Sequence, residues 1–365
     1  MAQAAASNSQ AILCQAILTL SLPMLAVKHL CLRRTAALSK IGCRLVGAPA
    51  AAAAAVVPAA SDHYETRTQR TGMFARPDPI VWPDDPGVVV PKPLSESQLA
   101  QYEDQGFLLV RQVIGQEDVK ECIEELEELE GDVDAAAARH GSRVALEPDG
   151  GCLRSVYALH LDPVSVMGRI STSLPIVSCA QQILGGDVYV HQWRLNLQKA
   201  FHGTGFSWHS DFETWHSEDG LPTPRAMSAV LLIDRNREVN GSLMVIPGSH
   251  RWFLACPGRQ GPENWKTSLR SQHYGSPGEQ ELSLLAEAGD VVHCTGEPGD
   301  VLIFDNNLLH ASASNRSPWH RRNVFTVFNS VHNRLEHPFY AEQPRPEHIG
   351  HREHCATLHP LQKKV

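Results

Sequence analysis

The sequence predicts a mainly β fold with flanking helices, built around a double-stranded β-helix, the jelly-roll core of cupin-like proteins. Two observations predict this class. From residue 188 onward the chain consists of short apolar stretches separated by Gly, Pro and Asn, with no helical pattern between them, which favours antiparallel strands. In addition, 42% apolar and 20% charged residues among 365 are typical of a folded chain with a sizeable core.

Residues 1–71 are predicted to lie outside the folded domain, as a transit peptide and an Ala-rich extension. Residues 1–61 contain five Lys or Arg but no Asp or Glu, and residues 50–55 are all alanine. Such a composition is typical of import into a eukaryotic organelle, either mitochondrion or plastid. The alternative is a membrane anchor at residues 11–27, but these 17 uncharged residues are barely long enough and include a proline. We therefore expect no membrane span in the mature protein.

The folded domain is predicted over residues 94–352, preceded by a Pro-rich extended arm at 72–93. Ser95 and Gln98 form a capping box that predicts the start of a helix, and Gly106 predicts its end. A strand follows at 107–111, and the 3–4 spacing of apolar residues predicts an amphipathic helix at 117–129 with an acidic outer face. The Ala-, Gly- and Asp-rich residues 132–151 are predicted to form a mobile loop. Further strands are expected at residues 188–192, 229–233, 243–246, 291–293, 301–304 and 324–328.

The end of the chain, residues 353–365, is predicted to be a polar tail. Four histidines lie in or near this tail at partly helical spacing, namely His348, His351, His354 and His359. Metal binding is one interpretation of this cluster. We expect a polar surface segment instead, because chain termini are usually solvated.

Charge and cysteine content exclude several classes of protein. With 32 Lys plus Arg against 40 Asp plus Glu, the net charge of −8 makes a poor partner for a phosphate backbone, so nucleic-acid binding is not expected. The nine cysteines are scattered and form no C-x-x-C pair. This pattern favours free thiols in a reducing compartment over a disulfide framework or a zinc ribbon.

The pattern His209-x-Asp211 is the first candidate for chemistry. On a strand, alternate side chains share a face, so these two residues could bind one cation together. A histidine and a carboxylate at this spacing, joined by a distant histidine, form the facial triad of non-haem Fe(II) oxygenases. That triad leaves open positions on the iron for a chelating cosubstrate and for O2.

A second His-x-Asp pattern occurs at His160 and Asp162, so the pattern alone does not identify the site. Pro163 follows that second pattern directly, which is awkward within a paired strand. By contrast, His310 follows a predicted strand and a turn, and Arg321 follows eleven residues later. An arginine at that position could pair with a dicarboxylate bound to the metal. We therefore predict His209, Asp211 and His310 as the metal ligands.

These residues resemble those of the Fe(II)/2-oxoglutarate dioxygenases of the phytanoyl-CoA dioxygenase superfamily. Within it, residues 206–222, FSWHSDFETWHSEDGLP, resemble the signature segment of the ectoine hydroxylases. The resemblance spans roughly residues 98–352 and none of the N-terminal extension. It implies hydroxylation of ectoine to 5-hydroxyectoine, with O2 consumed and succinate and CO2 released. It also implies that the protein could form a homodimer.

The resemblance further implies a role for each matching residue. The Fe(II) ligands would be His209, Asp211 and His310. The 2-oxoglutarate contacts would come from Asn196, Phe206, Ser228 and Arg321. The ectoine pocket would be lined by Gln192, Arg194, Trp215, Phe304, Asn323 and Phe325. Such a set suits a small zwitterion, since aromatic faces attract the delocalised amidinium and Arg or Gln can hold the carboxylate.

Two departures from the family pattern bear on the substrate. Trp193 stands where a small residue is usual, and Gln198-Lys199 replaces a usual Lys-Pro pair. Alternation along a strand predicts that Trp193 points away from the pocket, in which case substrate choice survives.

Two alternative functions follow from the same residues. One is hydroxylation of another small zwitterionic solute or of an acyl-CoA, although an acyl-CoA would need a basic groove for its phosphates. The other is a non-catalytic jelly-roll module that only retains the metal, which the complete triad and Arg321 disfavour.

Overall fold

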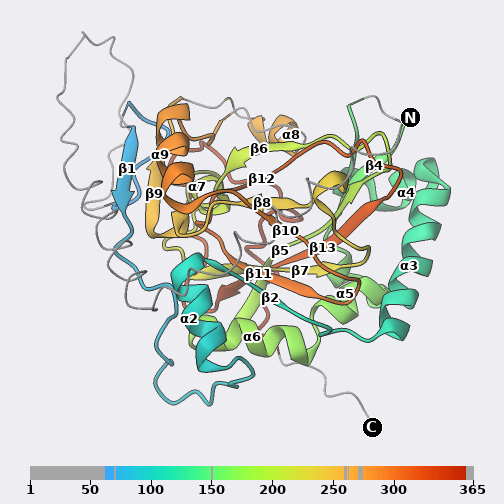
Figure 1. Cartoon of the computed structure of the whole chain (residues 1–365), viewed down its shortest axis with the longest axis horizontal. Coiled ribbons are helices and arrows are strands. Elements are labelled where there is room, and N and C mark those ends of the chain that lie inside the picture. Colours follow the sequence, from blue (N-terminus) through green and yellow to red (C-terminus); the bar gives the residue numbers. More distant parts are fainter. Residues whose placement is uncertain are drawn as a thin grey trace, which may run out of the picture. The chain divides into compact units, whose positions relative to one another are not determined.

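The computed structural model describes residues 62–69, 71–148, 151–258, 261, 263–269 and 274–358. Over these residues the chain forms two antiparallel sheets, with an additional two-stranded sheet β1-β9 (Figure 1). The larger sheet has seven strands in the order β2-β11-β7-β13-β5-β4-β3, and the smaller has four in the order β10-β8-β12-β6. Every strand pair is antiparallel, as the sequence predicts for a jelly-roll core.

The strands have the following bounds: β1 Gly72–Ala75, β2 Phe107–Val110, β3 Val144–Leu146, β4 Leu153–Tyr157, β5 Val188–Gln198, β6 Phe206–His209, β7 Ala226–Leu232, β8 Leu243–Val245, β9 Trp252–Ala255, β10 Val292–Cys294, β11 Val301–Asp305, β12 His310–Ser312 and β13 Arg321–Ser330. The α-helices are α2 Glu96–Gln105, α3 Gln116–Gly131, α4 Val133–His140, α5 Val166–Ser171, α6 Leu174–Leu184, α7 Asp211–Thr214, α8 Asn264–Ser268 and α9 Glu279–Gly289. A π-helical turn, η3, covers Trp215–Asp219.

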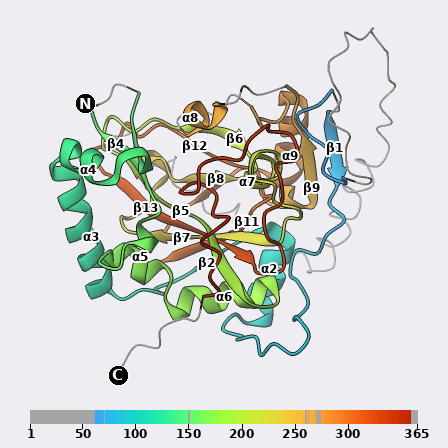
Figure 2. The same ribbon diagram turned by 180° about the vertical axis from the view of Figure 1, so that it is seen from behind.

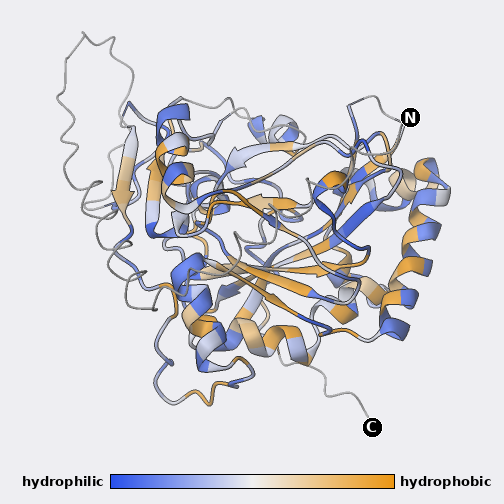
Figure 3. Ribbon diagram, viewed as in Figure 1, coloured by the Kyte–Doolittle hydropathy of each residue, from blue (hydrophilic) through white to orange (hydrophobic). Residues whose placement is uncertain are grey.

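Strand β7 illustrates how the large sheet divides the core. Ala229 and Leu231 pack with residues of α3, α5 and α6, which cover one face of the sheet (Figure 2). Val230 and Leu232, which alternate with them, pack with Leu243 of β8 in the smaller sheet. Figure 3 shows apolar residues along the central strands and on the inner sides of the helices. The two sheets therefore face each other, and Ser228 of β7 lines a pocket between them.

Sequence signals locate helix α2 as predicted. Ser95 caps α2 by accepting a hydrogen bond from the backbone N–H of Gln98, and the Gln98 side chain accepts one from the Ser95 N–H in return. Gly106 ends the helix in the left-handed region, at φ 82°. The predicted helix at 117–129 is α3, and its apolar stripe packs on the large sheet.

Two predictions about local structure are wrong. Residues 132–151 are not a mobile loop, because α4 and β3 lie within them and Asp132 caps α4 by accepting from the Ala135 N–H. The second wrong prediction is that no helices lie between the strands after residue 188. Helices α7, α8 and α9 lie between strands there, and α9 begins with Glu279 and Glu281 in its first turn, a favourable charge at a helix N-terminus.

The predicted domain boundaries are too narrow at both ends. Tyr64 and Arg67, placed by sequence in the extension, are buried at 3% exposure each, and the predicted arm contains β1, which pairs with β9. At the other end, Cys355 is buried, and the Leu358 N–H donates to the Val188 carbonyl of β5. The domain therefore includes residues 62–69 and 353–358. Residues 1–61, with the predicted transit peptide, lie outside the described residues.

Within the described part of the chain, no helix is both long enough and apolar enough to cross a membrane.

Candidate iron and 2-oxoglutarate site

The three predicted metal ligands meet at one edge of the smaller sheet. His209 is the last residue of β6 and His310 the first of β12, and the two are directly opposite each other across this antiparallel pair. The sequence predicted that Asp211 lies on the same strand as His209. In the structure it is instead the first residue of α7, which Ser210 caps. The strand-to-helix turn brings the carboxylate back toward both imidazoles.

The orientation of both rings suits a metal ion. His209 Nδ1 lies 2.8 Å from the Ser207 carbonyl oxygen, and His310 Nδ1 lies 3.0 Å from that of Leu308. Because a carbonyl only accepts, each Nδ1 carries the proton and each Nε2 keeps its lone pair. His209 Nε2 is 3.6 Å from Asp211 Oδ1, and His310 Nε2 is 3.9 Å from Asp211 Oδ2. All three ligand atoms lie within 4.8 Å of one another, so they could bind one ion.

The protonation states also fit metal binding. Burial lowers the pKa of His310 to about 4, and the neighbouring His209 adds to this effect, so His310 is neutral at physiological pH. Burial disfavours the Asp211 carboxylate, but His310, His209 and Arg194 outweigh it and lower the pKa of Asp211 below its usual value. A neutral His310 and an ionised Asp211 are the forms in which these residues ligate a divalent ion.

Arg321 is a buried cation in the same pocket. It is the first residue of β13 and 1% exposed, with Nη1 donating to Asn196 Oδ1 at 2.6 Å and Nε donating to the Gly241 carbonyl at 3.0 Å. Among the described residues, no carboxylate forms an ion pair with it. Burial, together with Arg194 and Arg154, lowers the pKa of Arg321 to about 9. A buried guanidinium without a counter-charge is a binding site for an anion such as a dicarboxylate.

Most of the predicted site residues line one open pocket between the two sheets. They are Gln192, Arg194, Asn196, Phe206, His209, Asp211, Ser228, His310, Arg321 and Phe325. Ser228 Oγ is buried and has no hydrogen-bond partner among the described residues. This hydroxyl is therefore free to contact a bound ligand.

Three predicted substrate residues do not line this pocket. Phe304 is fully buried, with its ring 5.0 Å from that of His310. Trp215 is 2% exposed, and its ring lies 4.9 Å from that of His191. Asn323 lies on β13 between Arg321 and Phe325, on the face that these two residues present to the pocket, and its Oδ1 has no partner among the described residues. Their contact with substrate stays a prediction.

Arg154 also lines the pocket, although it was not among the predicted site residues. It pairs with Glu147 at 3.1 Å, and its guanidinium lies 5.9 Å from the centre of the Phe206 ring. Glu147 in turn accepts from Thr204, another residue that lines the pocket. An arginine inside the apolar stretch of β4 was the available signal, because a charge on a buried strand needs a partner or a ligand.

Trp193 points away from the pocket, as alternation along β5 predicts. Its side chain is fully buried among the residues that pack under α5 and α6, and its indole N–H donates to Ser171 Oγ at 2.7 Å. The second His-x-Asp pattern is not a metal site. His160 packs against Trp193 and His351, and Asp162 follows the short helix at Leu159–Leu161.

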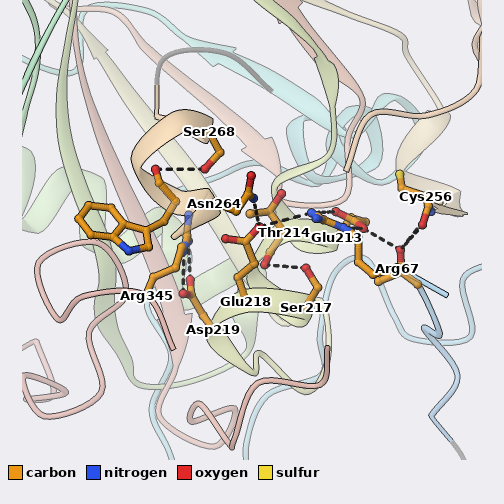
Figure 4. Close-up of polar contacts among 12 residues, drawn as sticks. Arg67, Glu213, Thr214, Ser217, Glu218, Asp219, Cys256, Asn264, Ser268 and Arg345 are labelled. Carbon is orange, nitrogen blue, oxygen red and sulfur yellow. Dashed lines mark hydrogen bonds and ion pairs between the residues drawn. The ribbon is translucent and has the colours of Figure 1, made fainter. Parts of the chain in front are cut away.

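A buried ionic network supports the segment that carries Asp211 and Trp215 (Figure 4). Arg67 Nε lies 2.6 Å from Glu213 Oε1, and its Nη2 lies 3.5 Å from Glu218 Oε1. Arg345 forms a bidentate pair with Asp219, whose Oδ2 also lies 3.3 Å from His191 Nε2. Residues 211–219 are therefore held in place by ion pairs with Arg67, near the start of the described chain, and with Arg345, near its end.

An antiparallel sandwich whose pocket joins two imidazoles and a carboxylate to a buried, unpaired guanidinium defines the class of non-haem Fe(II)/2-oxoglutarate-dependent dioxygenases. The sequence profile described as phytanoyl-CoA dioxygenase (PhyH) matches residues 102–323, and this protein belongs to that family.

Curated and solved relatives narrow the similarity further. Ectoine dioxygenase of Bordetella parapertussis is 42% identical over 308 residues, which cover 84% of this chain and 97% of the relative. The structure of EctD from S. alaskensis with 2-oxoglutarate and 5-hydroxyectoine superimposes with a TM-score of 0.70 at 36% identity, covering 82% of this chain and 98% of that one. The same protein with bound Fe gives a TM-score of 0.69 at 35% identity, with the same coverage of both chains.

Proposed function

We propose that this protein hydroxylates ectoine to 5-hydroxyectoine, consuming O2 and 2-oxoglutarate and releasing succinate and CO2. The observation that carries the proposal is the meeting of the His209–Asp211–His310 triad with the unpaired Arg321 in one pocket. Support for the particular substrate comes from the 42% identity to an ectoine dioxygenase and from the similarity to EctD with 5-hydroxyectoine.

In this proposal, His209, Asp211 and His310 hold the Fe(II). Bound there with 2-oxoglutarate, the iron supplies the activation of O2 and the oxidation of the substrate C–H bond. The chain's own contribution is orientation. The two Nδ1–H groups donate to backbone carbonyls, and these hydrogen bonds would keep each Nε2 directed toward the ion.

Arg321 anchors the far carboxylate of 2-oxoglutarate. Asn196 keeps this guanidinium oriented through its 2.6 Å hydrogen bond, the free Ser228 hydroxyl adds a donor, and Phe206 provides an apolar wall. Binding the cosubstrate neutralises a buried cation that otherwise lacks a counter-charge, so a dicarboxylate is favoured over a neutral oxo compound.

Ectoine is held beside the iron by Gln192, Arg194 and Phe325. Contacts from Trp215, Phe304 and Asn323, which do not line the pocket, stay a prediction. Arg194 donates to Ser155 at 3.0 Å and Gln192 donates to the Ile349 carbonyl at 2.7 Å, which fixes both polar groups before substrate arrives. They bind the ectoine carboxylate, and the face of Phe325 stacks with its amidinium. Such preorganisation lowers the cost of orienting a small ligand.

A substrate panel tests this function. The protein is given Fe(II), ascorbate and 2-oxoglutarate under air, with ectoine, proline or an acyl-CoA in separate reactions, and succinate and hydroxylated product are quantified. We expect equal amounts of succinate and 5-hydroxyectoine in the reaction with ectoine, and no coupled product in the reactions with proline or the acyl-CoA. If only proline or only the acyl-CoA gave coupled turnover, that compound and not ectoine would be the substrate. If no compound were turned over, the non-catalytic alternative would be supported.

We also propose that residues 1–61 act as a transit peptide. The support is their basic, acid-free, Ala-rich composition. The relatives compared above are bacterial and give this import no support. A fluorescent protein carrying residues 1–71 should accumulate in a mitochondrion or plastid of a eukaryotic host, whereas one carrying only residues 62–71 should not. Uniform distribution of both would refute import. Homodimer formation and the lack of nucleic-acid binding stay predictions.

A further inference from the structure

The C-terminal segment of the described chain, residues 345–358, is fastened along β5 (Figure 2). The His351 N–H donates to the His191 carbonyl at 2.8 Å, and the Leu358 N–H donates to that of Val188 at 2.9 Å. The Ile349 carbonyl accepts from Gln192, the residue expected to bind substrate. The expectation of a polar surface segment is therefore wrong for His351, which is completely buried, whereas His354 is exposed as expected.

Three side chains of this segment form a second cluster of metal-binding type. Glu347, His351 and His354 each offer a ligand atom within 4.8 Å of the others, and no residue of the iron site belongs to the set. Glu347 Oε1 lies 3.0 Å from His354 Nδ1 and 3.5 Å from His351 Nδ1. Both imidazoles thus turn the same nitrogen toward one carboxylate.

The burial of His351 is the second observation. Its side chain is 0% exposed, and neither ring nitrogen has a hydrogen-bond partner among the described residues. Leaving buried polar atoms without partners is unfavourable, and native proteins usually satisfy them with protein, water or an ion. An ion between Nδ1 and the Glu347 carboxylate would satisfy the nitrogen that faces the cluster.

Glu347 is oriented by backbone groups. Its carboxylate accepts hydrogen bonds from the N–H groups of Arg352, Glu353 and His354, at 3.0–3.2 Å. Hydrogen bonds of this kind hold ligating carboxylates in place in metal sites. The turn between Glu347 and His354 is therefore closed around the Glu347 carboxylate, which is held in place before any ion binds.

We propose that Glu347, His351 and His354 bind a divalent transition-metal ion of the Zn²⁺ type, separate from the catalytic iron. Two imidazoles and one carboxylate suit such an ion better than Ca²⁺ or Mg²⁺, which prefer oxygen ligands. His354 is half exposed, so solvent can supply a fourth ligand. The ion would cross-link both ends of the turn, and this turn carries the Ile349 carbonyl that positions Gln192.

Co²⁺ is the probe, because its visible absorption reports binding by nitrogen and oxygen ligands directly. The full chain without added histidines is used, with Asp211→Ala to disable the iron site. Into this background we introduce His354→Ala, or His332→Ala as the matched control, since both histidines are more than half exposed. Glu347→Gln is the fourth variant and keeps an oxygen acceptor for the backbone N–H groups.

We expect the background and its His332→Ala variant to bind one equivalent of Co²⁺ saturably. Binding should weaken at least tenfold with His354→Ala and with Glu347→Gln, while thermal melts of the metal-free proteins stay alike. Equal Co²⁺ binding with and without His354, or no saturable binding in the background, would overturn the proposal. The comparison between chains that differ only at residue 354 does not depend on the assignment of the iron ligands or on the substrate.

Discussion

At the scale of single residues, the central feature is Arg321, a guanidinium that is buried without a carboxylate partner among the described residues. Arg194 and Arg154 line the same pocket, and their charges help to lower the pKa of Arg321. The unpaired guanidinium explains why the pocket suits a dicarboxylate, and the triad beside it explains why that dicarboxylate can also chelate a metal.

Replacing Arg321 with alanine should therefore separate the cosubstrate from the substrate. A hydrogen-bonded charged pair contributes about 1.5–3 kcal/mol, so we expect the KM for 2-oxoglutarate to rise by roughly 10- to 100-fold. The KM for ectoine, measured at saturating 2-oxoglutarate, should change less than about threefold by the same reasoning. Arg322→Ala is the neighbouring control, because that side chain pairs with Asp234 and does not line the pocket. An unchanged requirement for 2-oxoglutarate in Arg321→Ala would remove this residue from its assigned role.

At the scale of elements, the segment from α7 to η3 is positioned by charges that come from distant parts of the chain. Arg67 and Glu213 are each 1% exposed, so their ion pair is fully removed from water. Removing one partner leaves the other buried and uncompensated, which is far more costly than losing a surface pair.

We expect Arg67→Ala to lower the free energy of unfolding by about 3–5 kcal/mol. Chemical denaturation measures this change directly. The matched control is Arg169→Ala, since Arg169 pairs with Glu121 with both side chains half exposed, and its cost should stay below about 1 kcal/mol. A chain shortened to begin at Gly72 should be destabilised at least as much as Arg67→Ala. Equal stability of the shortened and longer chains would show that residues 62–69 are dispensable for the fold.

Elements that have local sequence signals were predicted correctly, whereas the burial of side chains by distant partners was not predicted. The capping box at Ser95 and the apolar stripe of α3 are local, and both helices were located correctly. The burial of Arg67 and of His351 depends on partners more than 140 residues away, Glu213 and His191, which no short pattern shows. Asp211 was assigned to the correct site but to the wrong element, because His-x-Asp spacing fits both a strand and a strand-to-helix turn.

At the scale of the whole molecule, folding excludes water from several titratable groups. Burial lowers the pKa of His250, His310 and His351 to about 4 and that of His160 to about 3. In the unfolded chain these imidazoles titrate near 6.5. Between pH 6.5 and 4 the unfolded chain thus binds more protons than the folded protein, and stability falls as the pH falls.

Each such histidine contributes up to about 1.4 kcal/mol per pH unit to this loss. We expect the melting temperature of the metal-free protein to fall steeply between pH 6.5 and 4 and to be flatter above pH 7. In His250→Gln, which keeps a donor for the Glu103 carbonyl, the slope should be smaller. His332→Gln makes the same substitution at an exposed position and is the matched control. A melting temperature that is constant from pH 4 to 6.5 would contradict this description of the core.

The most direct test of the central claim is the visible charge-transfer absorption that Fe(II) shows when a 2-oxo acid chelates it, recorded without O2. With one equivalent of Fe(II) and excess 2-oxoglutarate, the unaltered protein should show this band, and admission of air with ectoine should discharge it as 5-hydroxyectoine forms. The Asp211→Ala variant, treated in the same way, should show neither the band nor the product. A band of full intensity in Asp211→Ala, or its absence from the unaltered protein, would contradict the assignment of His209, Asp211 and His310 as the iron site.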